Sequence, residues 1–184
     1  MNHPFDFDRS GDVHHGLETL FTATEIEAAI NRLADHLAKW YDDEPVAEVV
    51  MNGAFVFAAD LIRALSNRGV ILEMDFINLE KDRRSGTVTL ITANARSVEG
   101  REVLIIDGIF EHGKTLEYAE KHFMDLGASG VTSCVLLDKS GDNETLVKPD
   151  FHGFKCPNVF VVGYGLDLGH RYREVPFIAR LGQA

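Results

Sequence analysis

The ten residues DGIFEHGKTL, Asp107 to Leu116, combine a carboxylate, two glycines, a lysine and a threonine at a spacing that suits phosphate binding. Gly108 to Thr115 matches the pattern G-x-x-x-x-G-K-[ST], in which loop amides cradle phosphate groups and the lysine neutralises them. The preceding REVLIIDG is continuously apolar, as in a strand buried on both faces, and the following KTLEYAEKHFMDLG has helical periodicity. These residues predict a phosphate loop between a strand and a helix.

Two kinds of phosphate chemistry fit this loop. A nucleoside triphosphatase also needs a carboxylate that holds magnesium, and Asp138 at the end of CVLLD imitates one. However, strands that end in aspartate are common in α/β proteins, and this assignment leaves Asn52-Gly53 and residues 163–173 without a role. Backbone amides and a helix dipole at residues 111–115 suit an anionic phosphate in either case. We predict phosphate binding here and keep the triphosphatase as the weaker alternative.

The elements before the loop alternate between helix and strand. In TATEIEAAINRLADHLAKWY, Thr22 and Glu25 have the spacing of a capping box, and an apolar stripe follows at helical intervals. The stripe consists of Ile26, Ile30, Leu33, Leu37 and Trp40. AEVVMNGAFVFAADLIRAL predicts a short strand that ends near Val50, a turn at Asn52-Gly53 and a helix through Leu65.

The rest of the chain continues this alternation. VILEMDFINLE and TVTLITA predict a hairpin around the charged turn KDRRSG, and GVTSCVLLDK and NVFVVGYGLD predict further apolar strands. Apolar strands that alternate with amphipathic helices are typical of an α/β fold with a mainly parallel sheet flanked by helices. No linker or repeat divides the 184 residues, so we predict a single domain, 1–184.

Composition limits the partners of this domain. The formal net charge of -11 argues against a nucleic-acid surface, although local amides and cations can still hold a small anion. Cys134 and Cys156 lack metal-type spacing, which predicts reduced thiols in a cytoplasmic protein, and no apolar export or membrane segment is visible. We expect residues 1–20 to form a loosely ordered tail; a metal site at its histidines is the weaker alternative. These histidines are His3, His14 and His15.

Several separated segments together resemble the hypoxanthine-guanine phosphoribosyltransferases. VLIIDGIFEHGKTL is similar to the family's phosphoribosyl-pyrophosphate motif, and VVMNGAFVFAADLIRAL to its pyrophosphate loop and following helix. VLLDK and PDFHGFKCPNVFVVGYGLDLGHRYREVPFI resemble the purine-binding strand, hood and C-terminal stretch, and FTATEIEAAINRLADHL resembles the first helix. The motifs occur in the family's order from about Phe21 onward. They imply a type I phosphoribosyltransferase fold, with a small hood formed by parts of 21–45 and 150–184.

The resemblance implies transfer of a 5-phosphoribosyl group from phosphoribosyl pyrophosphate to hypoxanthine or guanine, giving IMP or GMP and pyrophosphate, with magnesium. Displacement at the anomeric carbon passes through an oxocarbenium-like state. The site must therefore hold two anionic ends of the donor and stabilise the departing pyrophosphate.

The resemblance also assigns the donor site residue by residue. The 5-phosphate contacts fall on Glu111, His112, Gly113, Lys114 and Thr115, and the pyrophosphate loop on Met51, Asn52 and Gly53, which carries a non-proline cis peptide in the family. Arg173 would neutralise pyrophosphate from the other side, and Asp167 and Asp107 would hold magnesium, a cation that prefers carboxylate and phosphate oxygens. The catalytic group would consist of Glu111, Asp107 and Arg173.

For the base, the resemblance implies that Lys139 donates to the exocyclic oxygen of a 6-oxopurine. Phe160 would stack on the ring, and the backbone of Val161 would contact the purine edge. Each position has an ordinary alternative: Lys139 as a solvated strand-end lysine, Phe160 as a core aromatic and Arg173 as a surface ion-pair partner. Their occurrence together favours the functional interpretation.

Three positions depart from the family's pattern. Asp107 keeps the first carboxylate of a pair that lies near the ribose hydroxyls, but Gly108 replaces the second; losing one charge-assisted hydrogen bond costs about 1.5–3 kcal/mol. Glu111 replaces the aspartate that is the candidate proton acceptor near purine N7, which moves the carboxylate by one methylene. His112 stands where a small hydroxyl residue is common, and either contacts the 5-phosphate or points to solvent.

The segment 78–88 should form a lid that excludes water from the closed site. The family's serine-tyrosine pair is absent there, and Arg83 and Arg84 either serve the anion or form a charged hairpin tip.

These departures leave two interpretations of the whole protein. One is an active purine-salvage phosphoribosyltransferase with a drifted ribose site. The other is a weakly catalytic or non-catalytic relative that senses a phosphoribosyl ligand or nucleotide. The enzyme is preferred because Lys139, Phe160, Asp167 and Arg173 all remain. Dimers or tetramers are usual for the family.

Overall fold

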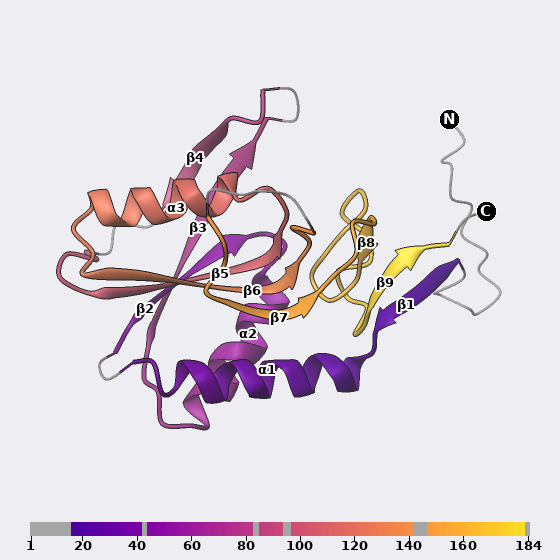
Figure 1. Cartoon of the computed structure of the whole chain (residues 1–184), viewed down its shortest axis with the longest axis horizontal. Coiled ribbons are helices and arrows are strands. Elements are labelled where there is room, and N and C mark those ends of the chain that lie inside the picture. The colour runs from indigo at the N-terminus through magenta and orange to yellow at the C-terminus, as the bar shows by residue number, and fades with distance from the viewer. Residues whose placement is uncertain (1–15, 42–43, 83–84, 94–96, 142–146, 183–184) are drawn as a thin grey trace.

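The structure is a computed structural model that describes residues 16–41, 44–82, 85–93, 97–141 and 147–182. Across these ranges, the centre is a six-stranded sheet whose strands run parallel except for one antiparallel edge strand, β4 (Figure 1). In sheet order the strands are β4 (Val88–Ala93), β3 (Glu73–Lys81), β2 (Val46–Met51), β5 (Glu102–Phe110), β6 (Gly130–Asp138) and β7 (Phe151–Lys155). The predicted α/β fold with a mainly parallel sheet is confirmed, as is the β3–β4 hairpin.

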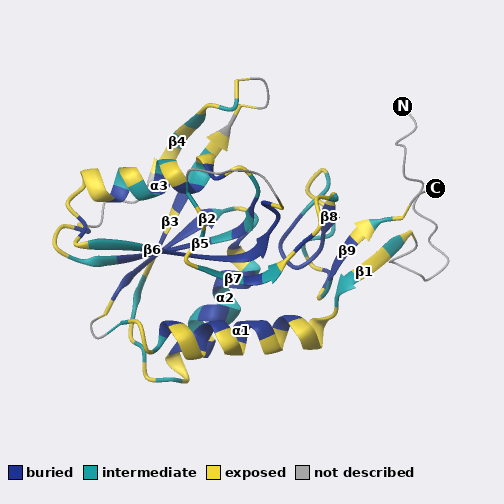
Figure 2. Cartoon of the chain, in the orientation of Figure 1, coloured by how far each residue is buried: buried dark blue, intermediate teal, exposed yellow. Residues whose placement is uncertain are grey.

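Helices cover both faces of this sheet (Figures 1 and 2). They are α1 (Ala23–Leu37), α2 (Phe55–Ser66) and α3 (Lys114–Asp125). Ile106 of β5 belongs to the core shared with α1 and α2, whereas its neighbour Ile105 belongs to the core under α3. Successive strand side chains point to opposite faces, so a strand covered on both sides is apolar along its length. This burial explains the continuous apolar run before Asp107.

The first helix begins as its sequence predicts. The Thr22 hydroxyl accepts a hydrogen bond from the Glu25 amide at 3.3 Å, and the Glu25 carboxylate accepts one from the Thr22 amide at 2.8 Å, which completes the capping box. The stripe residues Ile26, Ile30, Leu33 and Leu37 are buried. Trp40 requires a correction: it lies beyond the end of α1, is 58% exposed, and donates its indole N–H to Thr132 Oγ1 at 3.1 Å. Periodicity alone did not show where the helix stops.

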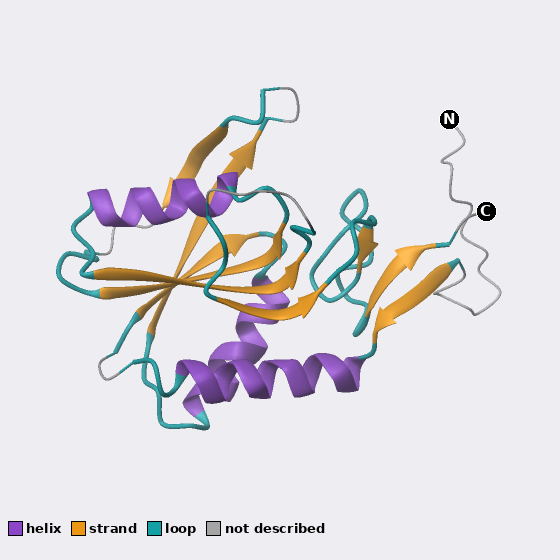
Figure 3. Cartoon of the chain, in the orientation of Figure 1, coloured by secondary structure: helices purple, strands orange, loops and turns teal. Residues whose placement is uncertain are grey.

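A smaller antiparallel sheet forms a hood beside the main one (Figure 3). Its described strands, in sheet order, are β1 (Leu17–Phe21), β9 (Ile178–Leu181) and β8 (Val161–Val162). Residues 17–20 therefore belong to a strand and not to a loosely ordered tail. Among the described residues of 21–45, Phe21 alone lies in this sheet, because α1 packs on the main sheet. Pairing with the distant β9 holds β1, and a local pattern does not reveal such a partner.

The segment NVFVVGYGLD is mostly irregular, although the sequence predicts a strand there. Its strand portion is Val161–Val162, after which Gly163 and Gly165 have φ values of 95° and 94°. This left-handed conformation suits glycine and turns the chain out of an extended path. The sequence also does not predict β7 or β9, which are short strands; β9 pairs with β1 from the other end of the chain.

Cys134 and Cys156 are buried free thiols. None of the described helices is both long and apolar enough to cross a membrane. The histidines of the N-terminal tail, His3, His14 and His15, lie outside the described residues.

Candidate functional site

The carboxyl ends of β2, β5 and β6 meet at one edge of the sheet, because these strands are parallel neighbours (Figure 1). β2 leads into Met51, Asn52 and Gly53, with a cis peptide between Met51 and Asn52. β5 leads into the loop at residues 111–113, and β6 into Lys139. The structure thus gathers three segments that the sequence had singled out separately.

The loop after β5 ends at a helix N-terminus suited to an anion. α3 begins at Lys114, and its N-cap residue Gly113 has a φ of 76°, which glycine adopts without steric cost. No side chain of the described residues caps this end. The first-turn amides of the helix therefore carry partial positive charge toward the loop. Such an end binds phosphate readily.

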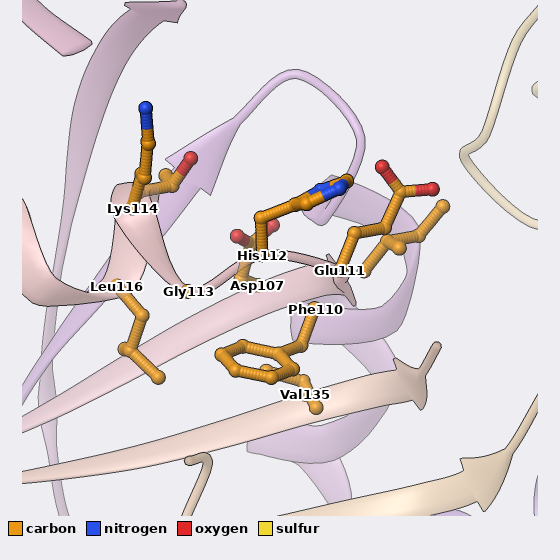
Figure 4. A pocket seen from close by; sticks show the side chains of 10 residues that line it. Asp107, Phe110, Glu111, His112, Gly113, Lys114, Leu116 and Val135 are labelled. Atoms are coloured by element: carbon orange, nitrogen blue, oxygen red, sulfur yellow. The ribbon is translucent and has the colours of Figure 1, made fainter. Parts of the chain in front are cut away.

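A pocket of about 210 Å³ lies at this loop (Figure 4). The side chains of Phe110, Leu116 and Val135 extend to one side of the loop, whereas those of Glu111, His112 and Lys114 extend to the other (Figure 4). His112 and Lys114 are exposed, and Thr115 is half-buried. Pockets for drug-sized ligands usually measure about 300–1,000 Å³, so this pocket suits one phosphate with part of a sugar.

Asp107 lines the same pocket from within β5, because the strand continues to Phe110. The acidic position and Gly108 therefore belong to the sheet and not to the flexible part of the loop. One Asp107 oxygen accepts a hydrogen bond from the Gly108 amide at 2.6 Å. Burial raises the pKa of Asp107 to about 6, against the opposing effect of backbone hydrogen bonds from Gly108 and Ile109. A half-buried carboxylate that lines an anion-binding pocket needs a cation or a proton beside it when the anion binds.

Lys139 is buried, and its ammonium lies 2.5 Å from a carboxylate oxygen of Glu111. The residue is 6% exposed, so the alternative of a solvated strand-end lysine is wrong. Its amide also donates to the Phe110 carbonyl at 2.8 Å, which fixes the start of this turn against the end of β5. Burial of an ammonium is costly unless a partner neutralises it, and Glu111 provides that partner.

Arg173 and Asp167 lie on the irregular segment that precedes β9. The guanidinium contacts an Asp167 oxygen at 2.8 Å and donates to the Gly165 carbonyl at 2.5 Å. The second Asp167 oxygen accepts a hydrogen bond from the His170 amide at 2.8 Å. Arg173 does form an ion pair, as its ordinary alternative supposed, but the side chains of both partners are only 22% and 28% exposed.

Phe160 and Val161 stand at the start of the hood strand β8. Phe160 is 55% exposed, so the alternative of a core aromatic is wrong. Val161 is buried and pairs with Arg180 of β9. An exposed ring next to an ordered strand leaves an aromatic face free for a planar ligand.

Comparisons with known proteins agree with this arrangement. A sequence model of the phosphoribosyl transferase domain matches residues 17–168. Hypoxanthine-guanine phosphoribosyltransferase of Bacillus subtilis is 39% identical over 92% of this chain and 96% of its own, and hypoxanthine phosphoribosyltransferase of Escherichia coli is 30% identical over 91% and 96%. Hypoxanthine phosphoribosyltransferase from Trypanosoma cruzi, in complex with the product IMP, superposes with a TM-score of 0.84 at 32% identity, covering 91% of this chain and 95% of that one.

The chain belongs to the hypoxanthine-guanine phosphoribosyltransferase family. The triphosphatase alternative is wrong, because the match to the phosphoribosyltransferases extends over most of the chain and not over the loop alone. Asp138, its candidate magnesium ligand, is instead 3% exposed, paired with Lys155, and hydrogen-bonded by the Ser140 amide at 2.9 Å. The mainly parallel sheet with flanking helices is that of a type I phosphoribosyltransferase.

Two residues next to the predicted site were missed by sequence reasoning. A Cβ atom at Gly165 would lie 2.7 Å from the Gly53 carbonyl oxygen, so the two backbones are in close contact. The Leu166 side chain reaches the Cβ position of Gly108, where it would lie 3.3 Å away. The repeated glycines of VVGYGLD were the available signal, since glycine in an apolar run often marks close backbone approach.

The predicted lid coincides with the β3–β4 hairpin. Asp82 and Ser85 close its turn through a hydrogen bond of 2.7 Å from the Ser85 amide to the Asp82 carboxylate. Arg83 and Arg84 lie outside the described residues. A Cβ atom at Gly86 would lie 2.6 Å from the Lys114 ammonium, so the hairpin contacts the start of α3. The hairpin is therefore adjacent to the phosphate loop.

The described residues contain no group of three or more histidine, cysteine or acidic side chains that could hold a metal by themselves. Asp107 and Asp167 flank the contact between Gly108 and Leu166, each one residue away along the chain. Carboxylates are suitable donors for magnesium, which is commonly held by one or two of them together with phosphate oxygens of a substrate. The donor set thus fits a magnesium ion that arrives with a polyphosphate.

Proposed function

We propose that this protein transfers the 5-phosphoribosyl group of phosphoribosyl pyrophosphate to hypoxanthine or guanine, forming IMP or GMP and pyrophosphate. The observation that carries the proposal is the meeting, at one sheet edge, of a helix N-terminus open to phosphate and the buried Lys139, which pairs with Glu111. The first suits the anionic end of the donor, and the second offers a buried hydrogen-bond donor for a 6-oxopurine. Family membership makes the reaction class the expected one.

At the donor end, the amides of residues 111–115 and the Thr115 hydroxyl bind the 5-phosphate, with His112 and Lys114 beside it. The backbone of residues 51–53 binds the pyrophosphate group, and Arg173 neutralises it from the hood side. Asp107 and Asp167 hold a magnesium ion, which when bound neutralises charge that develops on pyrophosphate oxygens. Positioning both anionic ends leaves the anomeric carbon between them open to attack.

At the acceptor end, the Lys139 ammonium donates to the exocyclic oxygen of the base, Phe160 stacks on the ring, and the backbone of Val161 contacts the purine edge. A base nitrogen forms the new bond to the anomeric carbon while the carbon–oxygen bond to pyrophosphate breaks, and its electron pair leaves with pyrophosphate. Glu111 accepts the proton that the base loses. Its contact with Lys139 places the carboxylate beside the base-binding position.

We also propose a cytoplasmic homodimer or homotetramer. Met74 and Phe76 of β3 and Phe55 of α2 are 39%, 38% and 42% exposed. Met74 and Phe76 are two residues apart on β3 and so point to the same face of the sheet, and contiguous exposed apolar surface often marks an interface between subunits. Analytical ultracentrifugation tests this assembly, and a monomer at micromolar concentration would contradict it.

The activity is tested by measuring pyrophosphate release with phosphoribosyl pyrophosphate, magnesium and one of four bases. We expect turnover with hypoxanthine or guanine, and xanthine reports how strictly the hood selects. Adenine should fail, because its exocyclic amine cannot accept a hydrogen bond from the Lys139 ammonium.

The missing carboxylate at Gly108 favours a second candidate, a nucleotide sensor with little or no catalysis. If no base is turned over while IMP or GMP still binds in calorimetry, the sensor replaces the enzyme. If neither turnover nor nucleotide binding occurs, both candidates fail.

A further inference from the structure

The side-chain space at Gly108 is already occupied. A Cβ atom there would lie 3.2 Å from the Gly53 carbonyl oxygen, 3.3 Å from the Gly53 carbonyl carbon and 3.3 Å from Leu166 Cδ2. The two carbon–carbon separations are shorter than ordinary carbon contacts of about 3.5–4.0 Å. Leu166 can rotate, but the Gly53 carbonyl belongs to the backbone of the loop after β2. A larger residue at position 108 would therefore press directly on that loop.

A second glycine also approaches this carbonyl closely. Gly165, with a φ of 94°, brings its Cβ position to 2.7 Å from the Gly53 oxygen. Gly165 is itself held at both polar groups by Arg173: its amide donates to the Arg173 carbonyl at 2.9 Å, and its carbonyl accepts from the guanidinium at 2.5 Å. The Gly53 carbonyl is thus in close contact with both β5 and the segment that carries Arg173.

We propose that Gly108 is a positioning residue for the loop at residues 51–53, so that the donor site is built around glycine and does not merely lack a carboxylate. This inference rests on the proposed function for the identity of the ligand, which is the diphosphate group that the loop backbone binds. Gly108 allows β5 to contact the loop closely, and Gly165 allows the segment that carries Arg173 to do the same. The contacts of Gly108 and Gly165 with the Gly53 carbonyl thereby set the position of the loop, and both require the absence of a side chain.

A consequence separates this role from that of a lost ribose ligand. If Gly108 were only a missing ligand, adding a carboxylate would improve donor binding. In the arrangement described here, adding any side chain displaces the Gly53 carbonyl and weakens contacts to the diphosphate. The base site at Lys139 and Glu111 is formed by other segments and should keep its affinity.

The test uses Gly108→Ala and Gly108→Asp in the full chain, with steady-state constants for both substrates and calorimetry with inorganic pyrophosphate and magnesium. Crowding a packed position by one methyl group typically costs enough for about a tenfold effect, so Gly108→Ala should raise the KM for phosphoribosyl pyrophosphate about tenfold. Gly108→Asp should raise it at least as much. The KM for the base should stay within about twofold, because its binding groups are not displaced.

Gly182→Ala is the matched control. A Cβ atom at Gly182 would lie 3.1 Å from the Gly16 carbonyl oxygen, a similar crowding of backbone by a methyl group, but at the far end of the hood. This variant should leave both KM values unchanged, and thermal unfolding of all three variants shows whether the fold is retained.

Should Gly108→Ala not fold, the double variant Gly108→Ala with Leu166→Val removes the contact at Leu166 Cδ2 and keeps the one at Gly53. A selective loss of donor affinity in the double variant supports the role of the Gly53 carbonyl. A normal donor KM there would assign the crowding to Leu166 and overturn the proposal.

A lower donor KM in Gly108→Asp, or an unchanged one in Gly108→Ala, would also overturn it. Failure of the proposed function can be told apart from failure of the positioning role, because the wild-type protein would then show no turnover with any base. Pyrophosphate calorimetry would still compare the wild type with Gly108→Ala, and equal affinities there would reject the positioning role.

Discussion

At the base end of the proposed site the binding group is a buried side-chain charge, whereas at the phosphoribosyl end it is mostly backbone. Lys139 is 6% exposed and forms an ion pair with the more exposed Glu111. The phosphoribosyl end offers instead the open N-terminus of α3 and the loop at residues 51–53, with one half-buried carboxylate, Asp107. In the proposed site, a charged side chain therefore binds the neutral base, whereas the helix dipole and backbone amides bind most of the anionic donor.

This difference fits the chemistry of the two ligands. A single exocyclic oxygen can be distinguished from an amine by one directed ammonium, and desolvation strengthens that hydrogen bond. A polyphosphate carries charge over many oxygens, and several amides can share it without placing many lysines in the site. Binding by backbone amides is also compatible with a protein that has a net charge of -11.

A substitution at Lys139 tests the difference between the two ends of the site most directly. Lys139→Met keeps the length of the side chain and removes its charge. Hydrogen bonds to charged groups contribute about 1.5–3 kcal/mol, so kcat/KM for hypoxanthine should fall by up to about 100-fold. The KM for phosphoribosyl pyrophosphate should change less, because the donor is also held by the loop at residues 51–53 and by Arg173. Steady-state kinetics with each substrate varied in turn measures both constants.

Lys39→Met provides the control for this change, because Lys39 is exposed and lies just beyond the end of α1. Equal losses for both substrates in Lys139→Met would show that the two ends are not separable in this way.

Arg173 tests the other end with a smaller expected effect. Arg173→Ala removes the contact with Asp167 and the hydrogen bond to the Gly165 carbonyl. Because hydrogen bonds to charged groups contribute about 1.5–3 kcal/mol, the KM for phosphoribosyl pyrophosphate should rise about tenfold or more. Arg173→Lys keeps the charge but not the planar fork, so it should recover only part of this loss.

Arg180→Ala is the matched hood control, since Arg180 pairs with Glu18 on an exposed strand edge. If Arg180→Ala weakens donor binding as much as Arg173→Ala does, the effect comes from a loosened hood. A larger change in the base KM than in the donor KM for Arg173→Ala would contradict the division between the two ends.

The elements that could be predicted from sequence are those with local signals. The capping box at Thr22 and Glu25 marks the start of α1, and the continuous apolar run of β5 announces burial on both faces. The hood strands β1 and β9 have no such signal, since they pair with each other from opposite ends of the chain. The end of α1 was also missed, because the stripe continued in sequence to Trp40 after the helix had stopped.

The site shows the same division. The order of motifs indicated which residues to gather, and the parallel strands explain why their carboxyl ends meet. The burial of Lys139 and the contact of Gly108 with the Gly53 carbonyl could not be predicted, because both depend on how separate segments pack. At Gly108 the sequence left open whether a ligand was missing or the site had been rebuilt. The close contact favours the second.

The smallest effect on catalysis is expected at Glu48, which lies inside β2, the strand that leads into the pyrophosphate loop. Glu48 is 3% exposed and stands in register with Asp75 of β3. Burial and, to a lesser extent, the charge of Asp75 raise the pKa of Glu48 to about 7. Its pKa in the folded state thus exceeds the unfolded value of about 4.3.

The stability that this protonated carboxyl contributes is therefore fully present below about pH 4.3 and is lost as pH rises through about 7. Glu48→Gln should remove this dependence, so the variant should gain stability relative to the wild type between pH 5 and pH 8, by up to about 3 kcal/mol. Urea unfolding at both pH values measures the difference, with the exposed Glu27→Gln as control. The donor KM should stay unchanged, because the Glu48 side chain points to the face of the sheet that α3 covers and not into the loop. A stability difference that does not change with pH would show that Glu48 is ionised in the folded protein throughout this range.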